Sequence, residues 1–278
     1  MHLHHILKGA VAAGHEVDLV CSGYAGAPAS DEIDGVRIHR RGHWAVANFT
    51  LPPLVRSMLK RERFDLLVED INKIPFYTPL YRGRTPLVAI VPHLFGKTVY
   101  REANPLTATY VFGAESLIPR VYRDVDFEVI SPSTRDDLIA RGMDGDRIRT
   151  IYCGTEHERF ALADPPPRNP TPLIVSWSRL RRYKSVDVAL RAFRHIHQAV
   201  ASDAPGLRDS VRHGETGTLV PYGDAQAFAA AALELLRAPD RWQAHSEAAR
   251  RWAATFSWER CARESLELFT RVAGGGGR

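Results

Sequence analysis

The chain has few cysteines and no long apolar run. Its 278 residues include three cysteines, Cys21, Cys153 and Cys261, which are far apart and form no C-x-x-C pair. This spacing offers neither a set of zinc ligands nor a disulfide framework, and it favours a reducing compartment. No segment approaches the roughly 18 apolar residues of a membrane-spanning helix, and the first residues lack a signal-peptide pattern. We therefore expect a cytoplasmic protein that is neither secreted nor membrane-spanning.

The chain has fewer acidic than basic residues. The formal net charge of +5 and the pI near 9.2 suit an anionic ligand, a nucleic acid or an acidic membrane surface. The sequence lacks zinc-finger spacing, an RNA-recognition aromatic motif and a concentrated basic arm, so we expect no nucleic-acid partner. It also lacks a nucleophile elbow with a Ser-His-Asp or Cys-His order, so nothing supports a hydrolase.

The hydrophobic pattern alternates between helical and strand-like segments. Apolar residues from Leu3 to Val11 recur at helical spacing, Gly14 ends that pattern, and residues 16–21 alternate as in a strand. Short strand patterns follow at 36–39, 65–68, 87–91, 127–130 and 148–152. With helical stretches among them, these strands predict an α/β fold with parallel sheets covered by helices.

Proline marks one domain boundary. Residues 161–172 contain five prolines, which cannot continue a helix or a central strand. We interpret this segment as a proline-rich linker. The expected segments are therefore an N-terminal domain at 1–160, the linker, an abbreviated second α/β domain at 173–255, a C-terminal helix at 256–273 and a disordered glycine-rich tail at 274–278.

The second domain opens with a strand pattern at 173–177, a basic turn and a helix pattern at 186–200. The turn is Trp177-Ser178-Arg179-Leu180-Arg181-Arg182-Tyr183-Lys184. A helix that begins after such a turn presents N–H donors and a positive dipole end, which bind phosphate. Departure of a diphosphate from a nucleotide sugar also needs cations to neutralise it. Arg179 and Lys184 are therefore candidate phosphate ligands, and a solvated basic turn is the alternative.

Further short motifs recur in a fixed order along the chain. They are Ile130-Ser131-Pro132-Ser133, Leu138 to Gly142, Ile148 to Gly154, Ser178-Arg179-Leu180 with Lys184, Gly206 to Val211, His213 to Gly217 with Leu219-Val220-Pro221, and Phe256-Ser257-Trp258. This order resembles the family 4 glycosyltransferases, also called group 1 glycosyl transferases. The motifs cover most of the chain, so no single short motif carries the resemblance.

The resemblance implies a GT-B fold, in which two Rossmann-like domains hold the acceptor and the nucleotide sugar respectively. It also implies sugar transfer with retention of configuration, without a metal ion or other cofactor, to a saccharide, lipid-linked or small-molecule acceptor. The family residues that match Arg179 and Lys184 contact the donor phosphates. His93, in Val91-Pro92-His93-Leu94-Phe95-Gly96, matches a histidine near the transferred sugar. A strand-end histidine bonded to the backbone is the alternative.

The two largest departures from the family pattern are at the start of the chain and before Ser202. Family members begin with a strand and a glycine-rich loop before the helix that starts here at His2. They also place several strand–helix units, including an E-x7-E signature, between the helix at 186–200 and the loop at Ser202. At roughly 30 residues per βαβ unit, about three units are absent. Glu259 and Glu267 have the E-x7-E spacing, but they lie on the final helix in the wrong context.

These departures leave a second functional class open. The chain is either a glycosyltransferase or a non-catalytic GT-B remnant that acts as a binding module or is inactive, and we expect an internal deletion and a late start in its gene. The loss of a central opening strand predicts an unpaired sheet edge or a rearranged core.

A basic amphipathic segment precedes the strand pattern at 65–68. Leu54, Val55, Met58 and Leu59 alternate with Arg56, Lys60, Arg61 and Arg63 on one expected helix. Such a helix suits peripheral contact with an anionic inner membrane face. The favoured alternative is a helix that covers the sheet and keeps its polar face in water.

Overall fold

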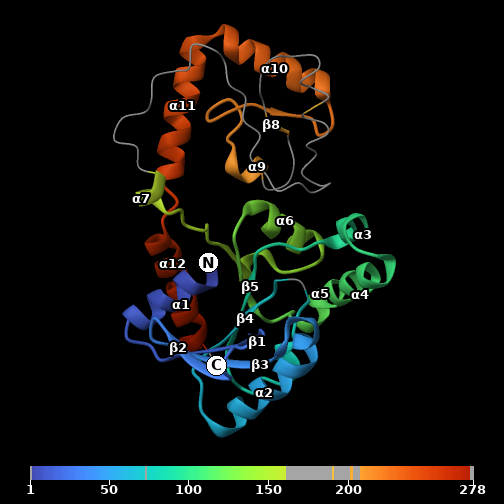
Figure 1. Cartoon of the computed structure of the whole chain (residues 1–278), viewed down its shortest axis with the longest axis vertical. Coiled ribbons are helices and arrows are strands. Elements are labelled where there is room, and N and C mark those ends of the chain that lie inside the picture. Colours follow the sequence, from blue (N-terminus) through green and yellow to red (C-terminus); the bar gives the residue numbers. More distant parts are fainter. Residues whose placement is uncertain (1, 73, 161–189, 191–200, 203–206, 276–278) are drawn as a thin grey trace. The chain divides into compact units, whose positions relative to one another are not determined.

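The computed structural model describes residues 2–72, 74–160, 190, 201–202 and 207–275 (Figure 1). These residues form two compact units, which we describe separately. Unit 1 comprises Met1–Gly154 and Ser257–Arg278, and unit 2 comprises Thr155–Phe256. The linker at 161–172, the strand at 173–177 and the cations Arg179 and Lys184 lie outside the described residues. So does the predicted helix at 186–200, except for residue 190.

The first sheet of unit 1 has three strands in the order β1-β3-β2. β1 (Val17–Gly23) pairs in parallel with β3 (Val36–His43). β2 (Ser30–Ile33) pairs antiparallel with β3 through a two-residue Asp34-Gly35 turn, in which both residues have positive φ, 51° and 77°. Asp-Gly favours this hairpin turn. The sequence analysis missed β2 because all four of its residues are exposed and form no apolar alternation.

The second sheet contains four parallel strands in sequence order, β4-β5-β6-β7. The strands are β4 (Leu67–Asp70), β5 (Leu87–Val91), β6 (Asp126–Val129) and β7 (Ile148–Thr150). Each lies within two residues of a predicted strand, and the prediction of a parallel sheet is confirmed. Because all four run in one direction, their carboxyl ends meet at one edge, where ligands bind in open α/β sheets.

Helices cover both faces of the second sheet. On one face, α1 (His2–Ala12) packs against α12 (Trp258–Gly275), and Ile6 and Leu268 join Val88 and Ile90 in one buried cluster. On the other face, α5 (Ile118–Val121) and α6 (Pro132–Ala140) cover a second buried cluster. That cluster includes Ile71, Leu87, Ala89, Val91, Ile118, Tyr122, Val125, Phe127, Val129, Leu138, Met143 and Ile148.

Four further helices of the chain extend or correct the predicted pattern. α2 (Ala47–Arg61) packs on β1 and β3, so its apolar side covers a sheet as the favoured alternative predicted. It begins before Pro52 and ends before Arg63, which the sequence analysis placed on the helix. α3 (Val99–Glu102) packs on α4 (Pro105–Ser116), and α7 (His157–Phe160) begins unit 2.

α12 also extends beyond its predicted end. It continues through Gly274 and Gly275, which the sequence analysis assigned to a disordered tail. At its start, the Ser257 side chain accepts a hydrogen bond from the Arg260 N–H at 3.1 Å, as expected for a cap.

Unit 2 has a two-stranded parallel sheet among its described residues, formed by β8 (Ala201–Ser202) and β9 (Leu219–Val220). Ser202 therefore belongs to a strand and not to the loop that the sequence predicted, because it pairs with Val220. The helices are α9 (Leu207–Ser210), α10 (Ala225–Arg237) and α11 (Pro239–Ala254). Asp224 caps α10 as predicted, accepting hydrogen bonds from Gln226 N and Ala227 N at 3.0 and 2.9 Å.

The two sheets of unit 1 are not paired with each other, and β1 and β4 are edge strands of their sheets. Across the described residues, β1 pairs only with β3 and β4 pairs only with β5. The expectation of an unpaired edge is therefore confirmed. In the same described part of the chain, no helix is long and apolar enough to cross a membrane.

The close crossing of α1 and α12 gives a stability prediction. A Cβ atom on Gly9 would lie 2.6 Å from Ala262 Cβ, so Gly9→Ala should destabilise the chain by about 1–3 kcal/mol through overpacking. Gly113 in α4 has no atom within 4 Å of such a Cβ, so Gly113→Ala should instead stabilise by up to about 1 kcal/mol. Urea unfolding followed by tryptophan fluorescence measures both, and equal effects would contradict the tight crossing.

Candidate functional site

His93 lies in the loop that follows β5 at the carboxyl edge of the second sheet. Its side chain is exposed, and its ring meets the Phe95 ring edge-on with the centroids 4.3 Å apart. Within the described part of the chain, the imidazole makes no hydrogen bond, so the backbone-bonded alternative finds no partner there. Partial desolvation lowers the pKa of His93, and the charges of Glu115 and Asp137 oppose that shift. The ring is therefore neutral and available near pH 7.

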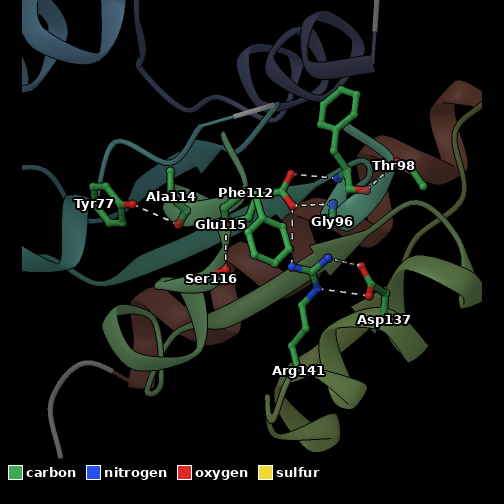
Figure 2. Close-up of polar contacts among 10 residues, drawn as sticks. Tyr77, Gly96, Thr98, Phe112, Ala114, Glu115, Ser116, Asp137 and Arg141 are labelled. Atoms are coloured by element: carbon green, nitrogen blue, oxygen red, sulfur yellow. Dashed lines mark hydrogen bonds and ion pairs between the residues drawn. The ribbon is translucent and has the colours of Figure 1, made fainter. Parts of the chain in front are cut away.

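A buried carboxylate from α4 holds the loop (Figure 2). Glu115 on α4 is fully buried, and its Oε1 and Oε2 accept hydrogen bonds from Phe95 N and Gly96 N, each at 2.8 Å. The two oxygens thus satisfy two consecutive backbone donors. Gly96 has φ +51°, a conformation that glycine adopts without strain.

The end of α6 completes this arrangement. Arg141 Nη1 lies 3.6 Å from Glu115 Oε2, while Nε and Nη2 of the same guanidinium contact the two Asp137 oxygens at 3.1 Å each. A Cβ on Gly96 would come within 2.9 Å of Arg141 Nη2. The sequence analysis missed Glu115, and its one signal was an acid within the apolar stretch of α4.

A second contact holds the loop from α6. The Thr134 hydroxyl donates to the Pro92 carbonyl at 3.1 Å, and Ser131 Oγ accepts from Thr134 N at 3.3 Å as the N-cap of α6. The family-like Ser131-Pro132-Ser133 motif therefore starts α6 beside the His93 loop. The structure brings His93 and this motif together, whereas Arg179 and Lys184 lie outside the described residues.

In unit 2, the loop between α9 and β9 carries the family-like motif at 213–217, and polar contacts fix its conformation. His213 Nδ1 accepts from Leu219 N at 3.0 Å, and Thr216 Oγ1 accepts from Arg212 N at 2.8 Å. His245 Nδ1 lies 2.7 Å from the Glu215 carbonyl oxygen, and it donates to that oxygen. These contacts hold the loop between α9 and β9 in place, and none of them identifies a catalytic group.

Two acids, the buried Glu128 and the partly buried Asp70, lie on the α1/α12 face near the same carboxyl edge. In the register of the sheet, Asp70 and Glu128 flank Ile90. Burial raises the pKa of Asp70 to about 6 and that of Glu128 to about 7. Ser265 donates to Glu128 Oε1 at 2.9 Å, while His2, whose pKa burial lowers to about 4, lies 3.6 Å away.

These groups form no metal site. In the part of the chain that the structure describes, no group of three or more His, Cys, Asp or Glu side chains could hold a metal ion. The candidate E-x7-E residue Glu267 instead pairs with Arg149 at 2.8 Å, which fits its assignment to a solvated helix face.

The described architecture is that of an α/β protein with the parallel sheets of GT-B glycosyltransferases. A glycosyltransferase structure from Rickettsia africae superimposes with a TM-score of 0.72, covering 99% of this chain and 94% of that chain at 13% identity. HepE from Anabaena, solved in complex with UDP-glucose, gives a TM-score of 0.59, with 91% and 99% covered at 12% identity. At these identities the likeness shows the fold alone.

The sequence comparison identifies the family. Residues 1–159 match the family model described as Glycosyltransferase Family 4, and residues 188–238 match the one described as Glycosyl transferases group 1. The first match covers more than half of the chain, which therefore belongs to Glycosyltransferase Family 4. A D-inositol 3-phosphate glycosyltransferase from Thermobispora bispora is 36% identical over 114 residues, which are 38% of this chain and 27% of that relative. The matched stretch thus spans about a quarter of the relative's length.

The buried Glu128 gives a pH prediction. Its pKa of about 7 in the folded chain lies above the usual glutamate value of 4.5. The folded state therefore binds the proton more tightly, and stability falls as pH rises between these values. Glu128→Gln keeps an acceptor for Ser265 and removes the buried charge. Its stability relative to the original chain should therefore rise by about 1–3 kcal/mol between pH 5 and pH 8.

Urea unfolding at both pH values measures this change. Glu267→Gln on the exposed side of α12 is the control, and its effect should stay below about 1 kcal/mol at either pH because exposed ion pairs contribute little. A difference between Glu128→Gln and the original chain that does not vary with pH would disprove the assigned pKa.

Proposed function

We propose that this chain transfers a sugar from a nucleotide diphosphate sugar to an acceptor, with retention of configuration. The observation that carries the proposal is the Family 4 match over residues 1–159, within which the His93 loop is held at the carboxyl edge of β5. The HepE structure in complex with UDP-glucose supports a nucleotide sugar as the donor.

Each candidate residue has a chemical role in this proposal. The bond between the anomeric carbon and the diphosphate oxygen breaks, and a bond to the acceptor hydroxyl forms on the same face of the sugar. Arg179 and Lys184 neutralise the leaving diphosphate, which accepts the acceptor proton, so no protein base is needed. His93, neutral near pH 7, hydrogen-bonds a hydroxyl of the transferred sugar. Fixed cations supply the charge that a metal ion would otherwise provide.

The proposed setting is the cytoplasm, with a saccharide, lipid-linked or small-molecule acceptor. Peripheral contact with the inner membrane face would involve α2, on which Arg56, Lys60 and Arg61 are exposed. Residues 36–61 contain no acidic side chain, so this surface attracts anionic headgroups. The apolar side of α2 covers β1 and β3, which leaves its basic side for that contact.

A non-catalytic remnant is the second candidate. The specific observation that favours it is the short interval between Lys184 and Ser202, which leaves no room for the E-x7-E segment that contacts the donor in the family. Such a chain would bind an acceptor or partner without transferring sugar.

Nucleotide binding gives the first test of this function. A nucleotide that binds only the folded chain stabilises it by about 2.7 kcal/mol at about 100 times its Kd. In thermal-shift titrations with UDP, GDP, ADP and their sugars, we expect a saturable shift with one nucleotide. Arg179→Ala and Lys184→Ala should each weaken it, because each removes a cation from the diphosphate, whereas Arg56→Ala in α2 should not. Unchanged affinity in the first two variants would refute their assignment.

Turnover tests His93 separately. We expect His93→Ala to reduce kcat for sugar transfer by roughly 10- to 100-fold, because a hydrogen bond to the reacting sugar is lost. Its nucleotide affinity should remain unchanged. UDP release from UDP-glucose, with D-inositol 3-phosphate as the first acceptor, measures the effect. His15→Ala, an exposed histidine in the loop after α1, is the control, and an equal loss in both variants would argue against the role of His93.

A further inference from the structure

The loop that carries His93 is held at both of its ends by other elements. Before His93, the Pro92 carbonyl accepts the Thr134 hydroxyl of α6 at 3.1 Å. After it, Phe95 N and Gly96 N donate to Glu115 of α4. The backbone of the loop is therefore fixed on both sides, while the imidazole has no hydrogen bond to the described residues.

The Glu115 contact is directional. One carboxylate accepts two consecutive N–H groups at 2.8 Å each, so it fixes the orientation of the peptide plane between Phe95 and Gly96. Hydrogen bonds to an ionised acceptor are roughly twice as strong as neutral ones. Because Glu115 is fully buried, water does not compete for the two oxygens.

Arg141 sets the position of that carboxylate. Its guanidinium lies 3.6 Å from Glu115 Oε2 and is itself oriented by two contacts of 3.1 Å with Asp137. Figure 2 shows Glu115 between the loop at Gly96 and the Arg141–Asp137 pair. The ion pair also offsets the cost of burying the Glu115 charge.

We propose that Glu115, aligned by Arg141, is a positioning residue that fixes the His93 loop and thereby directs the His93 imidazole toward the transferred sugar. This inference rests on the proposed function for the role of His93, whereas the fixing of the loop stands on the contacts alone. Displacement of a catalytic group by about 1 Å can cost about 100-fold in rate, so a residue that holds this loop would act on kcat.

A second buried carboxylate provides a matched control. Glu69 on β4 accepts hydrogen bonds from Phe76 N at 2.6 Å and Thr78 N at 3.3 Å, in the loop after β4. It is only 3% exposed, and Tyr122 also donates to it. Glu69→Gln therefore makes the same chemical change at a similar depth, but the loop that Glu69 holds carries no proposed site residue.

Glu115→Gln tests the inference in the full chain. A glutamine offers one acceptor oxygen, so its amide group would oppose one of the two loop donors. We expect amide hydrogen exchange at Phe95 and Gly96 to accelerate at least about tenfold. The kcat for UDP release from UDP-glucose should fall roughly 10- to 100-fold, with a change in KM below about threefold.

Glu69→Gln should lower the melting temperature to a similar extent and leave kcat and the exchange at Phe95 and Gly96 unchanged. Arg141→Lys keeps the charge and loses the planar guanidinium. It should accelerate exchange at Phe95 and Gly96 and lower kcat, each by less than Glu115→Gln does. This milder variant keeps the test decisive if Glu115→Gln does not fold.

The outcomes separate this inference from the proposed function. Unchanged exchange at Phe95 and Gly96, or an equal loss of kcat in Glu69→Gln, would overturn the positioning role even if the chain is an active transferase. If the unaltered chain releases no UDP, the proposed function and the catalytic role of His93 both fail, and accelerated exchange in Glu115→Gln would still establish that Glu115 holds the loop.

Discussion

The burial of β5 is the constraint on which unit 1 depends. All five residues of Leu87–Val91 are buried, so the strand has no face that water can cover. Such a strand requires helices on both sides. α1 and α12 cover one face, α5 and α6 lie over the other, and α12 reaches this core from the far end of the chain. The C-terminal helix is therefore part of the first unit's core.

β5 fixes the position of the candidate site. Because β5 is flanked by β4 and β6, its last residue has a fixed position, and the loop that follows starts from a defined point. Glu115 and Thr134 then hold that loop from α4 and α6. An exposed, neutral histidine on a loop held in this way is suited to hydrogen-bond a sugar without losing much freedom on binding.

Much of this architecture could be predicted from local sequence. The run Leu87–Val91 is continuously apolar between Pro86 and Pro92, and the structure has the strand at those residues. Asp224 was a recognisable cap. β2 escaped prediction because its exposed residues carry no apolar pattern, although the Asp34-Gly35 turn was a usable signal. The role of Glu115 was not predicted because its partners are backbone N–H groups about 20 positions away. No residue type in the sequence identifies such donors.

We propose that this Family 4 chain transfers sugar with retention of configuration, and the configuration of the product tests that proposal. The most direct measurement is NMR of the anomeric proton in the product formed from UDP-, GDP- or ADP-sugars and a carbohydrate acceptor. We predict a new glycosidic bond with the same anomeric configuration as the donor. An inverted product would contradict the proposed mechanism, and the absence of any product from a chain that still binds the nucleotide would contradict transfer itself.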